Sequence, residues 1–320
     1  MAEKLTEAPD KGSRTFLDFP FADDLDGLDA DIAILGIPFG MPYQAATMAN
    51  DQSRAPDAIR RTPTMEDIEY TRNHFDFDLD GDLLAGKNIK IVDCGNVIAN
   101  SADHKEHYRL AEQAARKIFS KGAILVALGG DHGVPIPVMR ALDAFDEPVT
   151  LVHVDAHLDW RDEVNGETEG YSSPIRRASE MAWIDEIVQI GLRGIGSARA
   201  QEVADARAYG ANLISAYEVH DIGMDAVLDR IPDGGPYYLT IDADGIDPAI
   251  MPAVMAQTPG GLNWVQTRKL VHGLARKGRI LGMDLVEIAP QNDVGNITMI
   301  HAERLICNFI GASIRAGHCG

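Results

Sequence analysis

Three side chains that can bind a metal ion, Asp155, His157 and Asp159, occupy alternate positions just after a largely apolar stretch over residues 149–154. Alternate residues of an extended segment lie on the same face, so these side chains can point together from the end of a strand. Full extension would separate Asp155 from Asp159 by ~13 Å, so a shared site requires the chain to bend just after His157. A strand that ends in polar loop residues would explain one such motif, but not its recurrence elsewhere in the chain.

Residues of the same kinds follow three other apolar stretches. They are His132 after residues 123–128, Asp242 and Asp244 after residues 237–241, and Glu287 after residues 280–286. Mixed carboxylate and imidazole ligands suit manganese, nickel, iron or zinc, and do not suit calcium. Carboxylates crowded without cations would repel one another and raise one another's pKa values. The set therefore predicts a site for two divalent ions, in which a water between the ions is deprotonated near neutral pH.

An alternation of strands and helices would bring these residues together. Eight short apolar stretches are predicted strands: residues 31–36, 89–93, 123–128, 149–154, 187–192, 211–215, 237–241 and 280–286. Helical patterns lie between them, at residues 104–119, 135–145, 197–209, 264–277 and 297–309. This order predicts an α/β fold with a parallel sheet covered by helices on both faces, which also explains strands without a polar side. In such folds the ligand sites lie beyond the carboxyl ends of the strands.

The charge of the chain limits its partners. It has 29 Lys and Arg residues against 49 Asp and Glu residues, a formal net charge of −20. That charge disfavours nucleic acid and anionic membranes and permits a small cationic substrate, although acidity can also serve solubility alone. The three cysteines, Cys94, Cys307 and Cys319, form no C-x-x-C pair. Their spacing argues against a disulfide framework and fits a reducing compartment.

The composition is that of a globular protein, with 45% hydrophobic and 24% charged residues among 320. Residues 1–28 are acidic and weakly patterned and are predicted to form an N-terminal arm before a single domain over residues 29–320. The polar start is unlike a signal peptide, and no uncharged apolar run approaches the ~20 residues that span a bilayer. We therefore expect a cytoplasmic protein with no membrane partner.

The polar motifs resemble those of the ureohydrolase family, which includes arginases, agmatinases and related hydrolases of guanidino compounds. The matching segments are Gly129-Gly-Asp-His132, Asp155-Ala-His157-Leu-Asp159 and Asp242-Ala-Asp244-Gly-Ile-Asp-Pro248, with further matches at residues 36–39, 259–261 and 284–290. The resemblance covers roughly residues 30–312. It implies an agmatinase-like member with a three-layer α/β/α sandwich around a parallel eight-stranded sheet.

The same resemblance implies a role for each candidate residue. Two ligand sets that share Asp155 and Asp242 would hold two ions: His132, Asp155, Asp159 and Asp242 hold one, and Asp155, His157, Asp242 and Asp244 the other. A hydroxide that bridges the ions would attack the guanidinium carbon, releasing urea and an amine. Asp159 would steer the hydroxide and pass its proton to the amine, while Glu287 would pair with the guanidinium. The implied cofactors are two Mn²⁺ per subunit, with Ni²⁺ as the alternative.

The loop after the second motif departs from the family pattern. Tyr171 stands where arginases and agmatinases lead us to expect a histidine, and a tyrosine with a pKa near ~10 is a poorer proton shuttle at neutral pH. It is a candidate substrate contact. Trp160 is predicted either to form a cation–π wall beside the guanidinium or to pack in the core.

The variable loops also contain apolar and aromatic residues: Met41, Tyr43, Met48 and Met255. Such loops suit the zwitterionic head of arginine poorly, because burying a charged group without a partner is costly. We therefore expect arginine to be a poor substrate and favour agmatine. Guanidine, an alkylguanidine, a guanidino acid or a biguanide is the alternative.

A function of another class is that of a non-catalytic subunit in a hetero-oligomeric ureohydrolase. All six ligand positions are present, which favours the enzyme, and a deacetylase-like site would need only one zinc. By resemblance alone we expect a homo-oligomer, either a hexamer or a trimer. Three further expectations concern neighbouring residues: Asp131 and Asp247 support the ligands, His153 packs in the core, and Arg176 and Arg177 form a solvated face.

Overall fold

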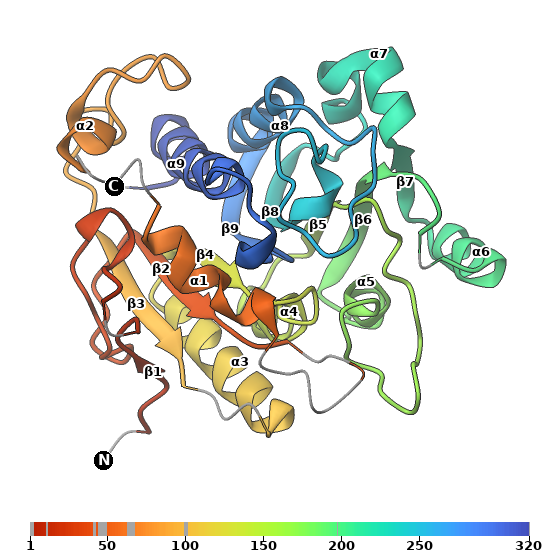
Figure 1. Ribbon diagram of the computed structural model, residues 1–320, viewed down its shortest axis with the longest axis horizontal. Coiled ribbons are helices and arrows are strands. Elements are labelled where there is room, and N and C mark those ends of the chain that lie inside the picture. Colours follow the sequence, from red (N-terminus) through yellow and green to blue (C-terminus); the bar gives the residue numbers. More distant parts are fainter. Residues whose placement is uncertain are drawn as a thin grey trace.

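The computed structural model describes residues 3–10, 12–40, 43, 50–62, 68–98, 102–196 and 198–319. Within them, one nine-stranded sheet crosses the molecule in the order β1-β3-β2-β4-β9-β8-β5-β6-β7 (Figure 1). Its strands are Thr6–Glu7 (β1), Ile32–Ile37 (β2), Ile91–Val97 (β3), Ile124–Gly129 (β4), Val149–Val154 (β5), Ile184–Leu192 (β6), Asn212–Ser215 (β7), Gly234–Asp242 (β8) and Gly278–Val286 (β9). Strands β2 to β9 are parallel, which confirms the eight predicted strands, whereas β1 is an unpredicted antiparallel strand at the edge.

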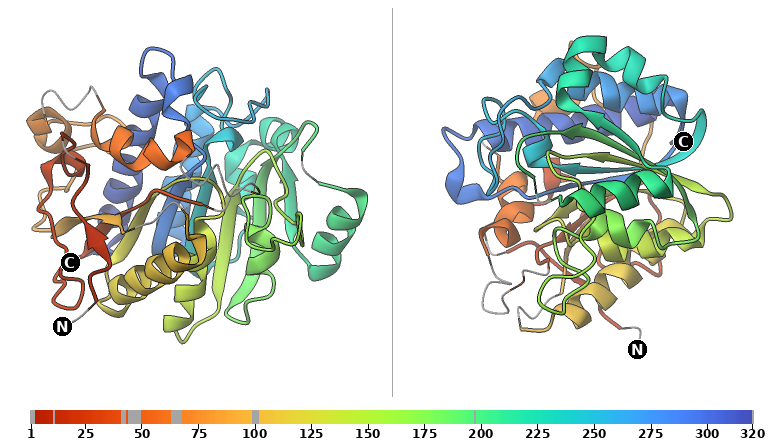
Figure 2. Two further views of the ribbon diagram at one scale, coloured as in Figure 1. Left: turned by 60° about the horizontal axis from the view of Figure 1, so that its bottom comes forward. Right: turned by 90° about the vertical axis from the view of Figure 1, so that its right-hand side faces the viewer.

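Helices cover both faces of this sheet, so the predicted three layers are confirmed (Figure 2). They are Ala55–Arg60 (α1), Ile68–Asn73 (α2), His104–Ser120 (α3), Pro135–Arg140 (α4), Pro174–Ala178 (α5), Ala200–Tyr209 (α6), Ala216–Leu228 (α7), Trp264–Lys277 (α8) and Ile297–Ala316 (α9). Apolar residues of α1, α7, α8 and α9 pack in one core, and those of α3, α4, α5 and α6 pack in the other.

The alternation of side chains in β2 explains why the strands are apolar throughout. Ile32 and Ile34 lie in the first core, Ala33 and Leu35 lie in the second, and all four are fully buried. Successive residues of a strand point to opposite faces, so a sheet covered on both sides favours apolar residues on both faces of each strand.

The N-terminal segment adds to both the sheet and the core. Thr6 of β1 pairs with Val97 of β3, and Phe16 and Leu17 are fully buried in the first core. Residues 3–10 and 12–28, predicted as an arm, therefore lie against the domain and contribute packed side chains. A two-residue strand that contains a glutamate carries no pattern from which the sequence could have predicted it.

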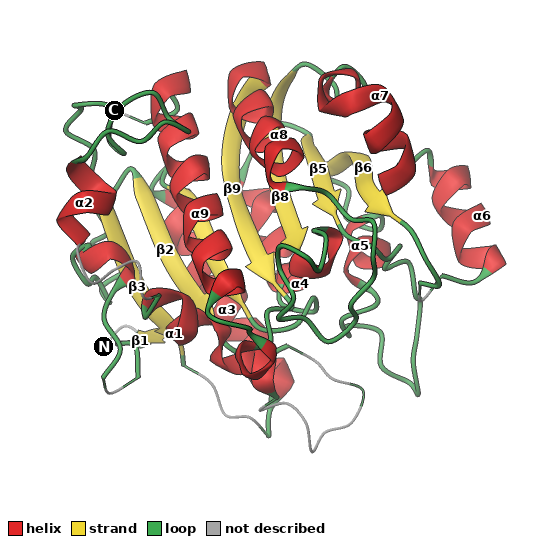
Figure 3. Ribbon diagram, turned by 45° about the horizontal axis from the view of Figure 1, so that its top comes forward, coloured by secondary structure: helices red, strands yellow, loops and turns green. Residues whose placement is uncertain are grey.

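The strand order places β4, β9, β8 and β5 side by side at the centre of the sheet, although they come from distant parts of the chain. The arrowheads of β9 and β8 point to the same edge (Figure 3). The segments that follow these four strands carry the candidate ligands, so the topology itself brings them to one place.

Candidate active site

Four central strands end next to one another and deliver the predicted ligands to one edge of the sheet. Asp155 directly follows β5, Asp242 is the last residue of β8, and Glu287 directly follows β9. His132 lies three residues beyond the end of β4. The convergence that the spacing predicts is therefore present, and it follows from parallel strands whose carboxyl ends share an edge.

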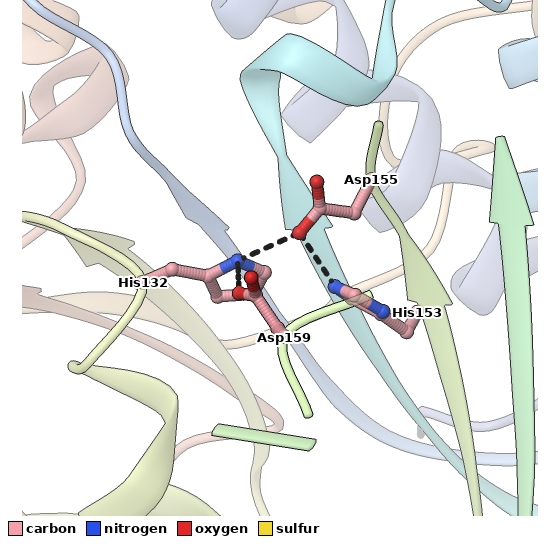
Figure 4. A group of neighbouring side chains, drawn as sticks. All are labelled: His132, His153, Asp155 and Asp159. Atoms are coloured by element: carbon pink, nitrogen blue, oxygen red, sulfur yellow. Dashed lines mark hydrogen bonds and ion pairs between the residues drawn. The ribbon is translucent and has the colours of Figure 1, made fainter. Parts of the chain in front are cut away.

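The first group of ligand atoms surrounds the Nδ1 atom of His132. Nδ1 lies 3.1 Å from the Oδ2 atoms of Asp155, Asp159 and Asp242. All four side chains are buried, and the close-up shows three of them pointing toward one another (Figure 4). Nδ1 has no hydrogen-bond partner among the described residues, although three carboxylate oxygens lie 3.1 Å away. A divalent cation among these atoms would satisfy all four, so the donor set fits a metal ion.

A second group adjoins the first through Asp155. The Nδ1 atom of His157 lies 3.3 Å from Asp155 Oδ1 and 3.2 Å from Asp244 Oδ2. Asp155 thus presents one oxygen to each group, as a ligand that bridges two ions would. Asp242 faces the first group with Oδ2, while its Oδ1 accepts a hydrogen bond from the Asp244 amide at 2.7 Å. The bridging role implied for Asp242 therefore stays a prediction.

Two residues of the site have a left-handed backbone conformation, which sets the direction of their own side chains. The bend expected after His157 occurs at Asp159, where φ is 51°, and Glu287 has φ 63°. Such conformations are uncommon for residues with a side chain and cluster at functional sites. Gly245 contributes by its lack of a side chain, because a Cβ there would lie 2.7 Å from the Asp155 amide nitrogen. A larger residue at this position would displace Asp155.

Burial and mutual repulsion raise the pKa values of Asp159, Asp242 and Asp244, whereas the three histidines beside Asp155 hold its pKa well below the usual range despite its burial. Burial, together with the charge of Asp155, raises the pKa of Asp159 to about 7 and that of Asp244 to about 6. Burial also raises the pKa of Asp242 well above its ordinary range. Burial alone would lower the pKa of His132, but its three carboxylate neighbours raise it well above the usual value. Without a cation this site must therefore hold protons, and binding a divalent ion would release them.

Glu287 lies beside the first group, where its carboxylate is held at both oxygens. Oε1 accepts a hydrogen bond from the His132 amide at 2.9 Å, and Oε2 accepts one from Gln52 Nε2 at 3.0 Å. Burial raises the pKa of Glu287, whereas these hydrogen bonds lower it. Gln52 belongs to a short 3₁₀-helix, Asp51–Arg54, and sequence reasoning missed it because no motif surrounds it. Only the fold brings residues 52 and 287 together.

The two aromatic residues predicted to contact substrate lie in different environments. Trp160 is only 3% exposed and packs against Tyr209, with ring centroids 5.7 Å apart and the rings tilted by 59°. This burial favours the alternative, packing in the core, and the wall at Trp160 stays a prediction. Tyr171 is 41% exposed, and its ring contacts that of Tyr43 at 4.7 Å. Burial raises the pKa of Tyr171, and so do nearby negative charges that include Glu287 and Asp159, so Tyr171 lies near the site.

The loop around Tyr171 is tied down by polar contacts. Tyr43 and Ser172 hydrogen-bond through their hydroxyl groups, and the Ser172 amide donates to Tyr43 Oη at 3.1 Å. Arg140 forms an ion pair with Glu169 of the same loop. Met41 and Met48, also expected in the substrate loops, lie outside the described residues, and Met255 is 64% exposed.

The cations that follow this loop are neutralised by acidic neighbours. Arg177 lies 2.6 Å from Asp162, and Arg176 lies 3.0 Å from Glu180. These pairs agree with the solvated face predicted for the two arginines. Neither is therefore positioned as a dedicated partner for a substrate carboxylate.

Three more residues for which the sequence made a prediction are Asp131, Asp247 and the strand residue His153. Asp131 accepts from the Gly133 amide at 2.9 Å, next to His132, and Asp247 accepts from the Gly260 amide at 2.8 Å. His153 is fully buried, as expected for a residue inside a strand. In addition, its Nε2 atom lies 2.9 Å from Asp155 Oδ2, a polar contact that packing alone does not explain.

A three-layer α/β/α fold with adjoining His and Asp groups at the carboxyl edge of its sheet defines a metal-dependent hydrolase. The chain belongs to the arginase family: the model of that family matches residues 30–311. The chain is 34% identical over 224 residues to a guanidinobutyrase of Pseudomonas aeruginosa, and the match covers 68% of this chain and 70% of that relative. It is also 33% identical over 291 residues to an agmatinase of Photorhabdus laumondii, covering 89% and 88% of the two chains.

A solved structure shares nearly the whole fold. The proclavaminate amidino hydrolase of Streptomyces clavuligerus superposes with a TM-score of 0.81 at 25% identity, covering 98% of this chain and 100% of that one. The protein is thus an arginase-family ureohydrolase, which acts on C–N bonds of amidine groups. In the part of the chain that the structure describes, no helix is both long enough and apolar enough to cross a membrane.

Proposed function

We propose that this ureohydrolase cleaves a guanidino compound other than arginine, with agmatine as the favoured substrate, and holds two divalent ions. The observation that carries the proposal is the shared Asp155, whose two oxygens face two adjoining ligand groups, with the Glu287 carboxylate beside the first. Mn²⁺ is the expected ion and Ni²⁺ the alternative, because both accept mixed imidazole and carboxylate ligands.

Different residues would bind the substrate and transfer the proton in this reaction. Glu287, held by His132 and Gln52, would bind the guanidinium and fix its central carbon against the ligand groups, which reduces the entropy cost of reaction. Asp159, whose Oδ2 lies 3.1 Å from His132 Nδ1 in the first ligand group, would accept a proton from the attacking water and return it to the departing amine. Bound divalent ions would supply the positive charge that lowers the pKa of that water.

The surroundings of Glu287 support a substrate without an acidic tail. The described mouth of the site contains the aromatic pair Tyr43 and Tyr171, while Arg140, Arg176 and Arg177 are already paired with carboxylates. Aromatic faces suit an alkyl chain or a second cation, such as the amine of agmatine. Guanidine, an alkylguanidine or a biguanide would meet the same surface.

A guanidino acid is the second candidate, because one relative at 34% identity is named guanidinobutyrase. We expect urea release to be fastest with agmatine and at least ~10-fold slower with arginine, since an unpaired buried carboxylate costs at least about 1.4 kcal/mol. The assay is urea release from arginine, agmatine, guanidinobutyrate, guanidine and biguanides, each with Mn²⁺ and with Ni²⁺. Arginine as the best substrate would overturn the interpretation of the Tyr43–Tyr171 surface.

We also propose that the chain acts in the cytoplasm as a homo-oligomer, a hexamer or a trimer. Closed symmetric assemblies are common among such enzymes. Light scattering of the purified protein should give a mass several times the 34.7 kDa of one chain. A monomer at micromolar concentration would contradict the assembly without touching the proposed reaction.

A further inference from the structure

Four buried polar residues lie side by side across the centre of the sheet. Backbone register pairs Gln189 of β6 with His153 of β5, His153 with Thr240 of β8, and Thr240 with Asp284 of β9. All four are fully buried. Residues paired in register on parallel strands share a face, so Gln189, His153, Thr240 and Asp284 form one polar row. Two members of this row, His153 and Thr240, come two residues before the ligands Asp155 and Asp242 in the sequence.

Polar groups buried in this way are costly unless they are hydrogen-bonded, and the bonds at one end of the row run in a fixed direction. The Asp284 carboxylate accepts from Thr240 Oγ1 at 2.6 Å and from the Tyr238 hydroxyl at 2.7 Å. A threonine hydroxyl has a single proton, and here Asp284 receives it. The 3.2 Å contact between Thr240 Oγ1 and His132 Nε2 must therefore be donated by the imidazole. His132 therefore keeps a proton on Nε2, and Nδ1, which faces the carboxylate group, is the nitrogen left to bind a metal ion.

The bonds at the other end fix the second histidine. Gln189 Nε2 lies 2.8 Å from the Leu158 carbonyl oxygen and 2.9 Å from His153 Nδ1. The carbonyl can only accept, so the amide nitrogen of Gln189 faces it and also donates to His153 Nδ1. The proton of neutral His153 is then on Nε2, which donates to Asp155 Oδ2 at 2.9 Å. His153 thus orients a ligand and leaves no nitrogen lone pair for a metal ion.

We propose that the polar row is a set of positioning residues that keeps a proton on Nε2 of both His132 and His153 and orients His132 and Asp155 before metal ions bind. This inference rests on the proposed dinuclear site. A ligand held in its binding orientation loses less conformational freedom on coordination, and partners of ligating histidines commonly raise metal affinity in this way. This positioning role explains why an otherwise apolar sheet buries a carboxylate, an amide and an imidazole next to one another.

The test is metal affinity, measured without turnover by competition between the metal-free protein and a fluorescent Mn²⁺ chelator. Thr240→Val keeps the shape of the side chain but removes the acceptor of His132 Nε2–H. We expect it to weaken Mn²⁺ binding about 10- to 100-fold, and Thr240→Ser to restore binding to within a few-fold of wild type. Thr150→Val is the matched control, because Thr150 is a buried threonine of β5 outside the row. It should bind Mn²⁺ like the wild type.

Gln189→Met tests the opposite end independently, since it keeps the length of the side chain and removes both donors. We expect a loss of Mn²⁺ affinity of the same order, about 10-fold or more. Wild-type affinity in both Thr240→Val and Gln189→Met would overturn the polar row while leaving the proposed function intact. A wild-type protein that binds neither Mn²⁺ nor Ni²⁺ would overturn the proposed function, and this inference with it.

Discussion

Alanine at position 155 should abolish urea release, with a loss of at least ~10³-fold, because Asp155 contributes to both ligand groups at once. Its Oδ2 lies 3.1 Å from His132 and its Oδ1 lies 3.3 Å from His157. Loss of a residue that merely supports a ligand costs 10- to 100-fold, so loss of a shared ligand should cost more. The measurements are urea release and metal content per chain by elemental analysis.

The same variant should lose most of the thermal stabilisation that Mn²⁺ gives the wild type. An ion present at 100 times its Kd stabilises the folded state by about 2.7 kcal/mol, and that contribution vanishes with the site. Asp57→Ala is a suitable control: it removes another buried carboxylate, one that lies 3.5 Å from Arg60, and should lower the melting temperature while leaving metal content unchanged. Two ions per chain and normal turnover in Asp155→Ala would contradict the assignment.

Wild-type metal content also separates the enzyme from a non-catalytic subunit. Two tightly bound ions per chain fit the reaction proposed above, whereas fewer than one would favour the non-catalytic role. All six predicted ligands, His132, Asp155, His157, Asp159, Asp242 and Asp244, lie in the two adjoining groups. A subunit that had lost catalysis would have no reason to bury so many carboxylates together.

The fold and the ligands could be predicted from the sequence because the strands are locally recognisable and the ligands follow directly after them. Strands β2 to β9 are short and apolar on both sides, and the polar residues at their ends are placed by chain topology alone. The two-residue repeat of a strand could also have identified His153 as a neighbour of the ligands, because His153 precedes Asp155 by two residues and therefore lies on the same face. Trp160 follows the bend at Asp159, where the alternation of a strand no longer applies, so its packing beside Tyr209 could not be predicted in this way.

Other features could not be predicted because they depend on contacts between distant segments. Gln52 reaches Glu287 across 235 residues of sequence, and no spacing rule links a 3₁₀-helix to the end of β9. The pairing of Tyr43 with Ser172 spans 129 residues. Loops that shape a substrate site obey no periodicity, which is why the ligand set was easier to predict than the substrate.

Glutamine at position 287 should impair substrate capture while leaving the metal ions in place. The change removes the negative charge that would face the guanidinium, and losing one member of a buried ion pair costs about 2–4 kcal/mol. That corresponds to a fall in kcat/KM of roughly 30- to 1,000-fold. Steady-state kinetics with agmatine, together with metal content, would measure the effect.

The geometry around Glu287 makes this substitution more damaging than loss of charge alone. Both carboxylate oxygens accept hydrogen bonds from donors, the His132 amide and Gln52 Nε2, so the new amide group must turn its own NH₂ toward one of them. The His132 amide can only donate, so the new NH₂ should face Gln52, whose own amide must then turn over to accept, and this rearrangement should shift the side chain from the position that aligns the guanidinium. Glu303→Gln makes the same change at a buried glutamate of α9 and should leave kcat/KM within about twofold, as expected for a change outside the site. Loss of the metal ions from Glu287→Gln, or wild-type kcat/KM in it, would show that Glu287 does not bind the guanidinium.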